Sequence, residues 1–169
     1  MSDPRFPIGN FVPKPSATAA DRAAWIEEIA QAPSLLRAAV AALPPGGLDR
    51  PYREGGWTGR QVVHHVADSH MNAFTRFRWA LTEENPTIKT YDEKAWALLA
   101  DNLTMEPEVS LCLLNHLHDR WAVILRSLND DQWKRSWVHP ESGARDLTAT
   151  LQAYAWHGRH HAAHLGLIR

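Results

Sequence analysis

The chain has 169 residues, of which 44% are hydrophobic and 22% are charged, and its formal net charge is −1. This length allows a sizeable core, and we expect a single domain over residues 1–169. The near-neutral charge gives no electrostatic reason to expect nucleic acid or an anionic membrane as a partner. No apolar run is long enough to predict a membrane span.

The N-terminal stretch "MSDPRFPIGN" has no basic segment followed by an apolar one, so no signal peptide is predicted. Cys112 is the single cysteine and has no partner within the chain. Both features agree with a reducing cytoplasm, and we expect a cytoplasmic protein. The segment "PRFPIGNFVPKP" is rich in proline and predicts an extended N-terminal arm.

The first two predicted helices carry apolar residues that recur every three or four positions, as in an amphipathic helix. The first covers about residues 19–43, and Pro33 is expected to kink or split it. It ends at "PPGG", residues 44–47. The second begins at Thr58, because "TGRQ" has the form of a capping box, and it extends to about Thr82.

The second half of the chain predicts one short helix and two long ones. The short helix covers about residues 92–100, and the next long helix has Pro107 in its first turn and continues to about Leu128. The segment "WKRSWVHPESGARD" is expected to be irregular, with extended stretches and a turn, before a last helix that begins near residues 146–148. Four long helices with connections of varied length favour an all-α, antiparallel four-helix bundle.

The last helix holds four of the ten histidines, in "WHGRHHAAHLGLIR". His157 and His161 form one i, i+4 pair, and His160 and His164 form a second pair interleaved with it. At about 100° per residue, the four imidazoles share the apolar face of the helix. Buried imidazoles need partners, and an i, i+4 pair can hold a metal ion from one side. Hydrogen-bonded core histidines or a surface cluster are the alternative interpretation.

The second helix, in "VVHHVADSH", offers a further ligand. Helical rotation places His65 at the edge of the apolar face, with Ser69, Asn72 and Arg76 on the same strip, and we interpret this strip as the wall of a substrate cleft. Arg76 has the chemistry to bind a substrate carboxylate, although an intramolecular ion pair is the more ordinary role. His64 is predicted to face solvent.

The choice of a third ligand stays open at this point. His70 lies on the apolar side of the second helix, and His118 lies on the apolar face of the third long helix. Spacing alone therefore does not choose among His65, His70 and His118.

Two stretches, "GGWTGRQVVHHVADSHMN" and "WHGRHHAAHLGLI", resemble the DinB-like superfamily, and more closely its YfiT-type branch of metal-dependent hydrolases, which is related to bacillithiol S-transferases. The resemblance runs almost end to end and includes "FPIGNF", "YDEKAW" and "HDRW". It implies a DinB-like four-helix bundle, one divalent metal ion per subunit with zinc or nickel as the candidates, a homodimer and a cytoplasmic setting.

The resemblance also implies a ligand set. The family pattern matches His65, which follows Trp57-Thr58 by about two turns, and it implies His160 and His164 as the other two ligands. His157 and His161 are left as donors that orient the ligands, or as packed imidazoles. The chain departs from the family where Leu165-Gly166-Leu167 replaces Arg-Gly-Gln after the last histidine.

Three imidazoles leave at least one coordination position open, unlike a closed structural zinc site. An activated water in that position favours a metal-dependent hydrolase of an unknown small molecule. A low-molecular-weight thiol in the same position would give an S-transferase of the bacillithiol type. A non-catalytic metal-binding or stress-associated protein is the third hypothesis. The sequence identifies no general base, because rotation places Asp68 toward the exposed side.

Overall fold

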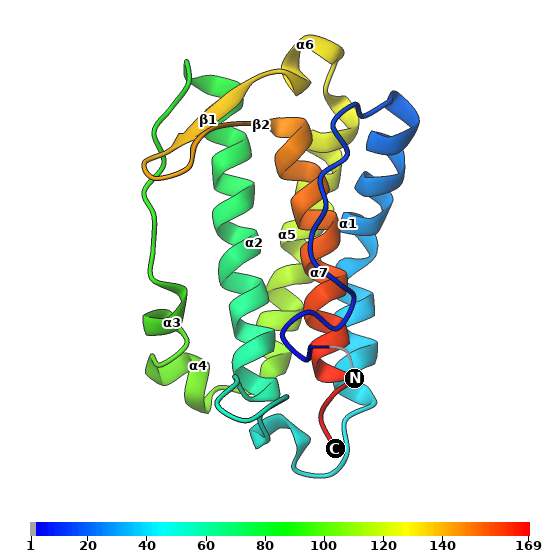
Figure 1. Cartoon of the computed structure of the whole chain (residues 1–169), viewed down its shortest axis with the longest axis vertical. Helices are drawn as coiled ribbons and strands as arrows, with labels where there is room; N and C mark the ends of the chain where they lie inside the picture. The colour runs from blue at the N-terminus through cyan, green and yellow to red at the C-terminus, as the bar shows by residue number, and fades with distance from the viewer. Residues whose placement is uncertain (1–2) are drawn as a thin grey trace.

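The computed structural model of the chain describes residues 3–169, which fold mainly into helices (Figure 1). The long helices are α1 (Ala19–Ala41), α2 (Gly59–Thr82), α5 (Pro107–Ser127) and α7 (Leu147–Leu165). The shorter elements are η1 (Gly47–Asp49), α3 (Glu93–Trp96), α4 (Ala100–Thr104), α6 (Asp130–Trp133), β1 (Ser136–His139) and β2 (Gly143–Asp146). In this part of the chain, we find no helix with the length and apolarity that a bilayer crossing requires.

The four-helix bundle predicted from the sequence is confirmed, and its helices run in two directions (Figure 1). Helices α1 and α7 run one way, and α2 and α5 run the other way. Each of α1 and α2 packs against both α5 and α7, so every helix has one parallel and one antiparallel neighbour. The parallel pairs arise because residues 83–106 return the chain along the whole bundle before α5 begins.

Local sequence signals explain where the helices begin. The Thr58 side chain accepts a hydrogen bond from the Gln61 amide, and the Gln61 side chain accepts one from the Thr58 amide, which confirms the predicted capping box. Thr18 and Asp21 cap α1 in the same way. Pro33 does not split the first helix, because α1 continues through it without interruption.

The connections between the long helices were predicted with mixed success. The helix expected at residues 92–100 is instead the pair α3 and α4. The extended stretches and the turn expected in "WKRSWVHPESGARD" are confirmed, and they form an antiparallel hairpin in which Ser136 pairs with Asp146 and His139 pairs with Gly143. Gly143 has φ of 81°, a left-handed conformation that glycine adopts without a steric penalty.

The core consists of two apolar clusters, one toward each end of the bundle. The first includes Phe77, Trp121 and Leu151, and the second includes Val63, Leu114 and Leu165. Each fully buried side chain of this size contributes roughly 1.5–3 kcal/mol. On α2, α5 and α7 the residues between the clusters include His70, His118, His157, His160 and His161, all of them at least partly buried. The bundle therefore has a layer of histidines between two apolar ends.

Candidate metal centre

Three histidines converge in this layer. His65 from α2 and His157 and His161 from successive turns of α7 offer one ring nitrogen each, and the three atoms lie within 4.8 Å of one another. They line a cavity of about 820 Å³ whose aromatic walls include Tyr52 and Trp57. Because the cavity is open, the three nitrogens face a space that a small molecule can enter.

The three imidazoles are in the protonation state that metal binding requires. Burial lowers the pKa of His65 to about 4, and it lowers the pKa values of His157 and His161 well below the ordinary range. Each ring is therefore neutral at pH 7 and keeps one nitrogen lone pair. Within residues 3–169, neither ring nitrogen of His65 has a hydrogen-bond partner. Neutral imidazole nitrogens of this kind are ligands that suit a divalent ion such as zinc.

A chain of hydrogen bonds fixes the tautomer of His157. The Nδ1 atom of His118 lies 2.6 Å from the Ile29 carbonyl oxygen, its Nε2 lies 2.8 Å from Nδ1 of His70, and Nε2 of His70 lies 3.1 Å from Nδ1 of His157. The carbonyl only accepts, so His118 donates to it through Nδ1. If the rings are neutral, His118 then accepts at Nε2 from the Nδ1–H of His70. His70 in turn accepts at Nε2 from the Nδ1–H of His157. The Nε2 atom of His157 is left with its lone pair for a metal ion.

The acceptor at the end of this chain exists because of Pro33. In an uninterrupted helix, the Ile29 carbonyl would accept from the amide of residue 33. Proline has no N–H, so α1 leaves that oxygen free although the helix continues. His118 supplies the missing donor, which connects a sequence irregularity in α1 to the metal centre.

A second, shorter chain acts on His161. The Nε2 atom of His164 lies 3.3 Å from the Arg5 carbonyl oxygen, and its Nδ1 lies 3.3 Å from Nδ1 of His161. His164 therefore donates to the carbonyl, and in its neutral form it accepts from His161. This arrangement leaves Nε2 of His161 free, as in His157. The N-terminal arm, which runs along α7, thus contributes to the orientation of one candidate ligand (Figure 1).

The structure brings His65 together with a different pair from the one that the family resemblance implied. His160 and His164 line the same cavity, but they lie on the side of it that the N-terminal arm covers. The His160 ring stacks on Trp156 at 4.1 Å between centroids, and His164 packs against Tyr52 at 4.1 Å. The Nδ1 atom of His160 is buried without a partner among the described residues. The interleaved pairs differ in rotation about the helix axis, and His157 and His161 are the pair turned toward His65.

Two further sequence-based interpretations are corrected here. His64 does not face solvent, because its Nδ1 and Nε2 atoms lie 2.7 Å from Ser110 Oγ and 3.1 Å from the Met105 carbonyl oxygen. His70 and His118, which competed as ligands, instead orient His157. Their hydrogen bonds could not be read from spacing, since the two residues come from different helices.

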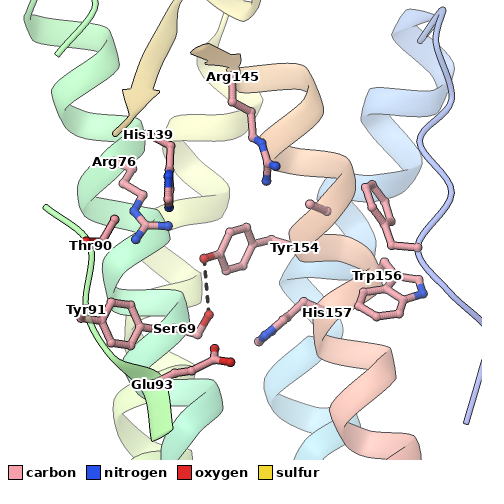
Figure 2. A pocket seen from close by; sticks show the side chains of 12 residues that line it. Ser69, Arg76, Thr90, Tyr91, Glu93, His139, Arg145, Tyr154, Trp156 and His157 are labelled. Atoms are coloured by element: carbon pink, nitrogen blue, oxygen red, sulfur yellow. Dashed lines mark hydrogen bonds between the residues drawn. The ribbon is translucent and has the colours of Figure 1, made fainter. Parts of the chain in front are cut away.

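A second cavity of about 330 Å³ adjoins the first (Figure 2). Ser69 and Arg76, both predicted to line a cleft, lie in its wall, and the Ser69 hydroxyl is 3.4 Å from the Tyr154 hydroxyl. Asn72 is in the lining of neither cavity, because its amide donates to the Asp68 carbonyl one turn earlier. His157 lines both cavities and so joins this cleft to the metal centre.

Residues 28–165 match the sequence model of the DinB superfamily. The chain belongs to the DinB superfamily. Among its DinB relatives, "Putative metal-dependent hydrolase YfiT" of Bacillus subtilis (strain 168) is 47% identical over 161 residues, which are 95% of this chain and 90% of that one. A "Putative metal-dependent hydrolase" of Bacillus cereus (strain 03BB102) is 49% identical over 169 residues, covering 100% of this chain and 97% of its relative.

Solved structures share the bundle fold of this chain. The structure of YfiT from Bacillus subtilis, described as a probable metal-dependent hydrolase with an unusual four-helix bundle topology, has a TM-score of 0.93 and 46% identity, with 96% of this chain and 94% of that chain covered. A mycothiol-dependent maleylpyruvate isomerase shares the fold, with a TM-score of 0.69, 20% identity, and 89% and 64% of the two chains covered.

Proposed function

We propose that the protein is a metal-dependent hydrolase whose ion is held by His65, His157 and His161. The observation that carries this proposal is the convergence of three neutral imidazole nitrogens, within 4.8 Å of one another, in an open cavity. Three protein ligands are typical of catalytic sites, whereas structural zinc sites are closed by four. When bound, a divalent ion would supply Lewis acidity and an activated water at neutral pH. Imidazole ligands suit zinc or nickel.

The chain's own residues would prepare this site before an ion binds. His70 accepts a hydrogen bond from Nδ1–H of His157, and His164 accepts one from Nδ1–H of His161. The Nε2 atoms of His157 and His161 therefore stay available to a metal ion. Trp57 packs at 4.6 Å from the His65 ring and limits its rotation. With the ligands already neutral and oriented, binding requires little side-chain ordering or proton release.

The experiment compares two activities on the same metal-loaded chain. One panel contains carboxylic esters, amides and phosphate esters, and the other pairs low-molecular-weight thiols with an electrophile. We expect hydrolysis that disappears on chelation and falls at least about 100-fold in His157→Ala. His64→Ala, which removes a buried histidine of α2 outside the site, is the matched control and should keep its activity.

Other results of this experiment would favour the S-transferase or the non-catalytic metal-binding protein. Thiol consumption without a hydrolytic product would contradict hydrolysis and favour the S-transferase, which would use the same ligands. Bound metal without turnover in either panel would favour a non-catalytic metal-binding protein. A homodimer and a cytoplasmic location are retained as proposals, which sedimentation of the purified protein and cell fractionation test.

A further inference from the structure

The second cavity contains a pair of arginines from different elements. Arg76 comes from α2 and Arg145 comes from β2, and Figure 2 shows both guanidinium groups directed toward the space beside the Tyr154 hydroxyl. The cavity volume of about 330 Å³ is within the range of small-molecule sites. Its walls come from α2, the hairpin, α7, residues 90–93 and Phe11 of the N-terminal arm.

One buried indole positions both guanidinium groups. The Cζ atoms of Arg76 and Arg145 lie 5.3 Å and 5.8 Å from the ring centroid of Trp137. Trp137 is itself fixed, because it is buried and its Nε1 donates to the Thr150 hydroxyl at 3.0 Å. Stacking on an aromatic ring orients a guanidinium and leaves its N–H donors free. Neither arginine forms an ion pair with any residue in the described range 3–169.

The other polar groups that line the cavity are hydroxyls, the His139 and His157 imidazoles and one carboxylate, Glu93. The Tyr154 and Tyr91 hydroxyls can donate hydrogen bonds, and burial raises the pKa of Tyr91 to about 12, so it stays protonated. Glu93 lines the same cavity and offsets one of the two arginine charges. A carboxylate matches this balance better than a phosphate dianion, and a guanidinium fork matches its two oxygens.

The cavity also connects to the metal centre. His157, Trp156 and Glu93 line both cavities, so a sufficiently long molecule held at the arginines can reach the candidate metal ligand His157. We propose that Arg76 and Arg145 form a subsite for a carboxylate group of the substrate. That this carboxylate belongs to a substrate rests on the proposed function, whereas binding of a carboxylate at the two arginines does not require it.

Binding of benzoate to the full chain tests the subsite, with benzamide as the neutral probe of similar shape and phenyl phosphate as the dianion. We expect benzoate to bind better than both, and Arg76→Gln and Arg145→Gln each to weaken it about 10- to 100-fold. Arg76→Lys should retain part of the affinity, because it keeps the charge but loses the fork. Arg78→Gln is the matched control, since Arg78 is on the same helix and stacks on Phe74.

Measurements with and without metal separate this proposal from the proposed function. Benzoate binding that survives chelation and depends on Arg76 and Arg145 supports the subsite even if the protein hydrolyses nothing. Benzoate binding that disappears on chelation and is unchanged in both arginine variants means that the carboxylate binds the ion, and it overturns the subsite. Equal binding of benzamide, or tighter binding of phenyl phosphate, overturns the assignment of a carboxylate.

Discussion

At the residue scale, the direction of a few protons determines which histidine nitrogens can bind metal. Each hydrogen-bonded chain ends on a backbone carbonyl, at Ile29 or at Arg5, and a carbonyl cannot donate. The sequence predicted that His65 and inward-facing imidazoles of the last helix form the site. The family resemblance implied His160 and His164 as the partners of His65, whereas the structure brings His157 and His161 to it. The two pairs differ only by a modest rotation of α7.

That rotation depends on packing that spacing does not reveal. Gly158 has no side chain, and a Cβ atom there would lie 3.0 Å from Cβ of Ala32, so α7 approaches α1 closely at this turn.

The tautomer argument predicts the effect of removing His70. His70→Ala should weaken metal binding about 10- to 100-fold, because His157 loses the partner that fixes its ring. Long-range ¹H–¹⁵N spectra of the metal-free protein should show His157 protonated on Nδ1, and His70→Ala should abolish that preference in His157 but not in His161. His70→Gln, whose carbonyl can accept from His157, should retain more affinity than His70→Ala.

His64→Ala serves as the control for loss of a buried histidine from α2. Unchanged affinity in His70→Ala, or a wild-type protein with His157 protonated on Nε2, would refute the orienting role of His70.

At the element scale, α1 shows how a helix continues through an internal proline. The sequence predicted a kink or break at Pro33, since proline removes one helical hydrogen bond and crowds the preceding turn. The helix continues because the buried side of α1 packs against α5 and α7, and because His118 satisfies the Ile29 carbonyl. By contrast, the start of α2 was predicted correctly, since a capping box acts within a few residues.

Substitution of Pro33 tests this link between α1 and the site. In Pro33→Ala, the new amide competes with His118 for the Ile29 oxygen, while the helix regains a hydrogen bond. We expect a higher melting temperature together with metal affinity that is several-fold weaker. Pro45→Ala, in the loop after α1, should change neither metal affinity nor the His157 tautomer. A stabilised Pro33→Ala protein with unchanged metal affinity would show that Ile29 plays no part in the site.

At the scale of the whole molecule, the residues that stabilise the fold and the residues of the candidate site lie in different parts of the bundle. The two apolar clusters stabilise the ends of the bundle, and the histidine layer between them opens into two adjoining cavities. The helical periodicity predicted the bundle, because burial of an apolar face is a property of each helix. The parallel pairing of α2 with α5 and the second cavity were not predictable, since both depend on how residues 83–106 and the hairpin cross the bundle.

The metal content of histidine variants tests the central claim most directly. The protein is purified without a histidine tag, and its metal stoichiometry and affinity are measured by elemental analysis and chelator competition. We predict one ion per chain in the wild type and in His160→Ala, loss of the ion in His65→Ala, His157→Ala and His161→Ala, and about tenfold weaker binding in His164→Ala. Loss of the ion in both His160→Ala and His164→Ala, with metal retained in His157→Ala and His161→Ala, would contradict the account.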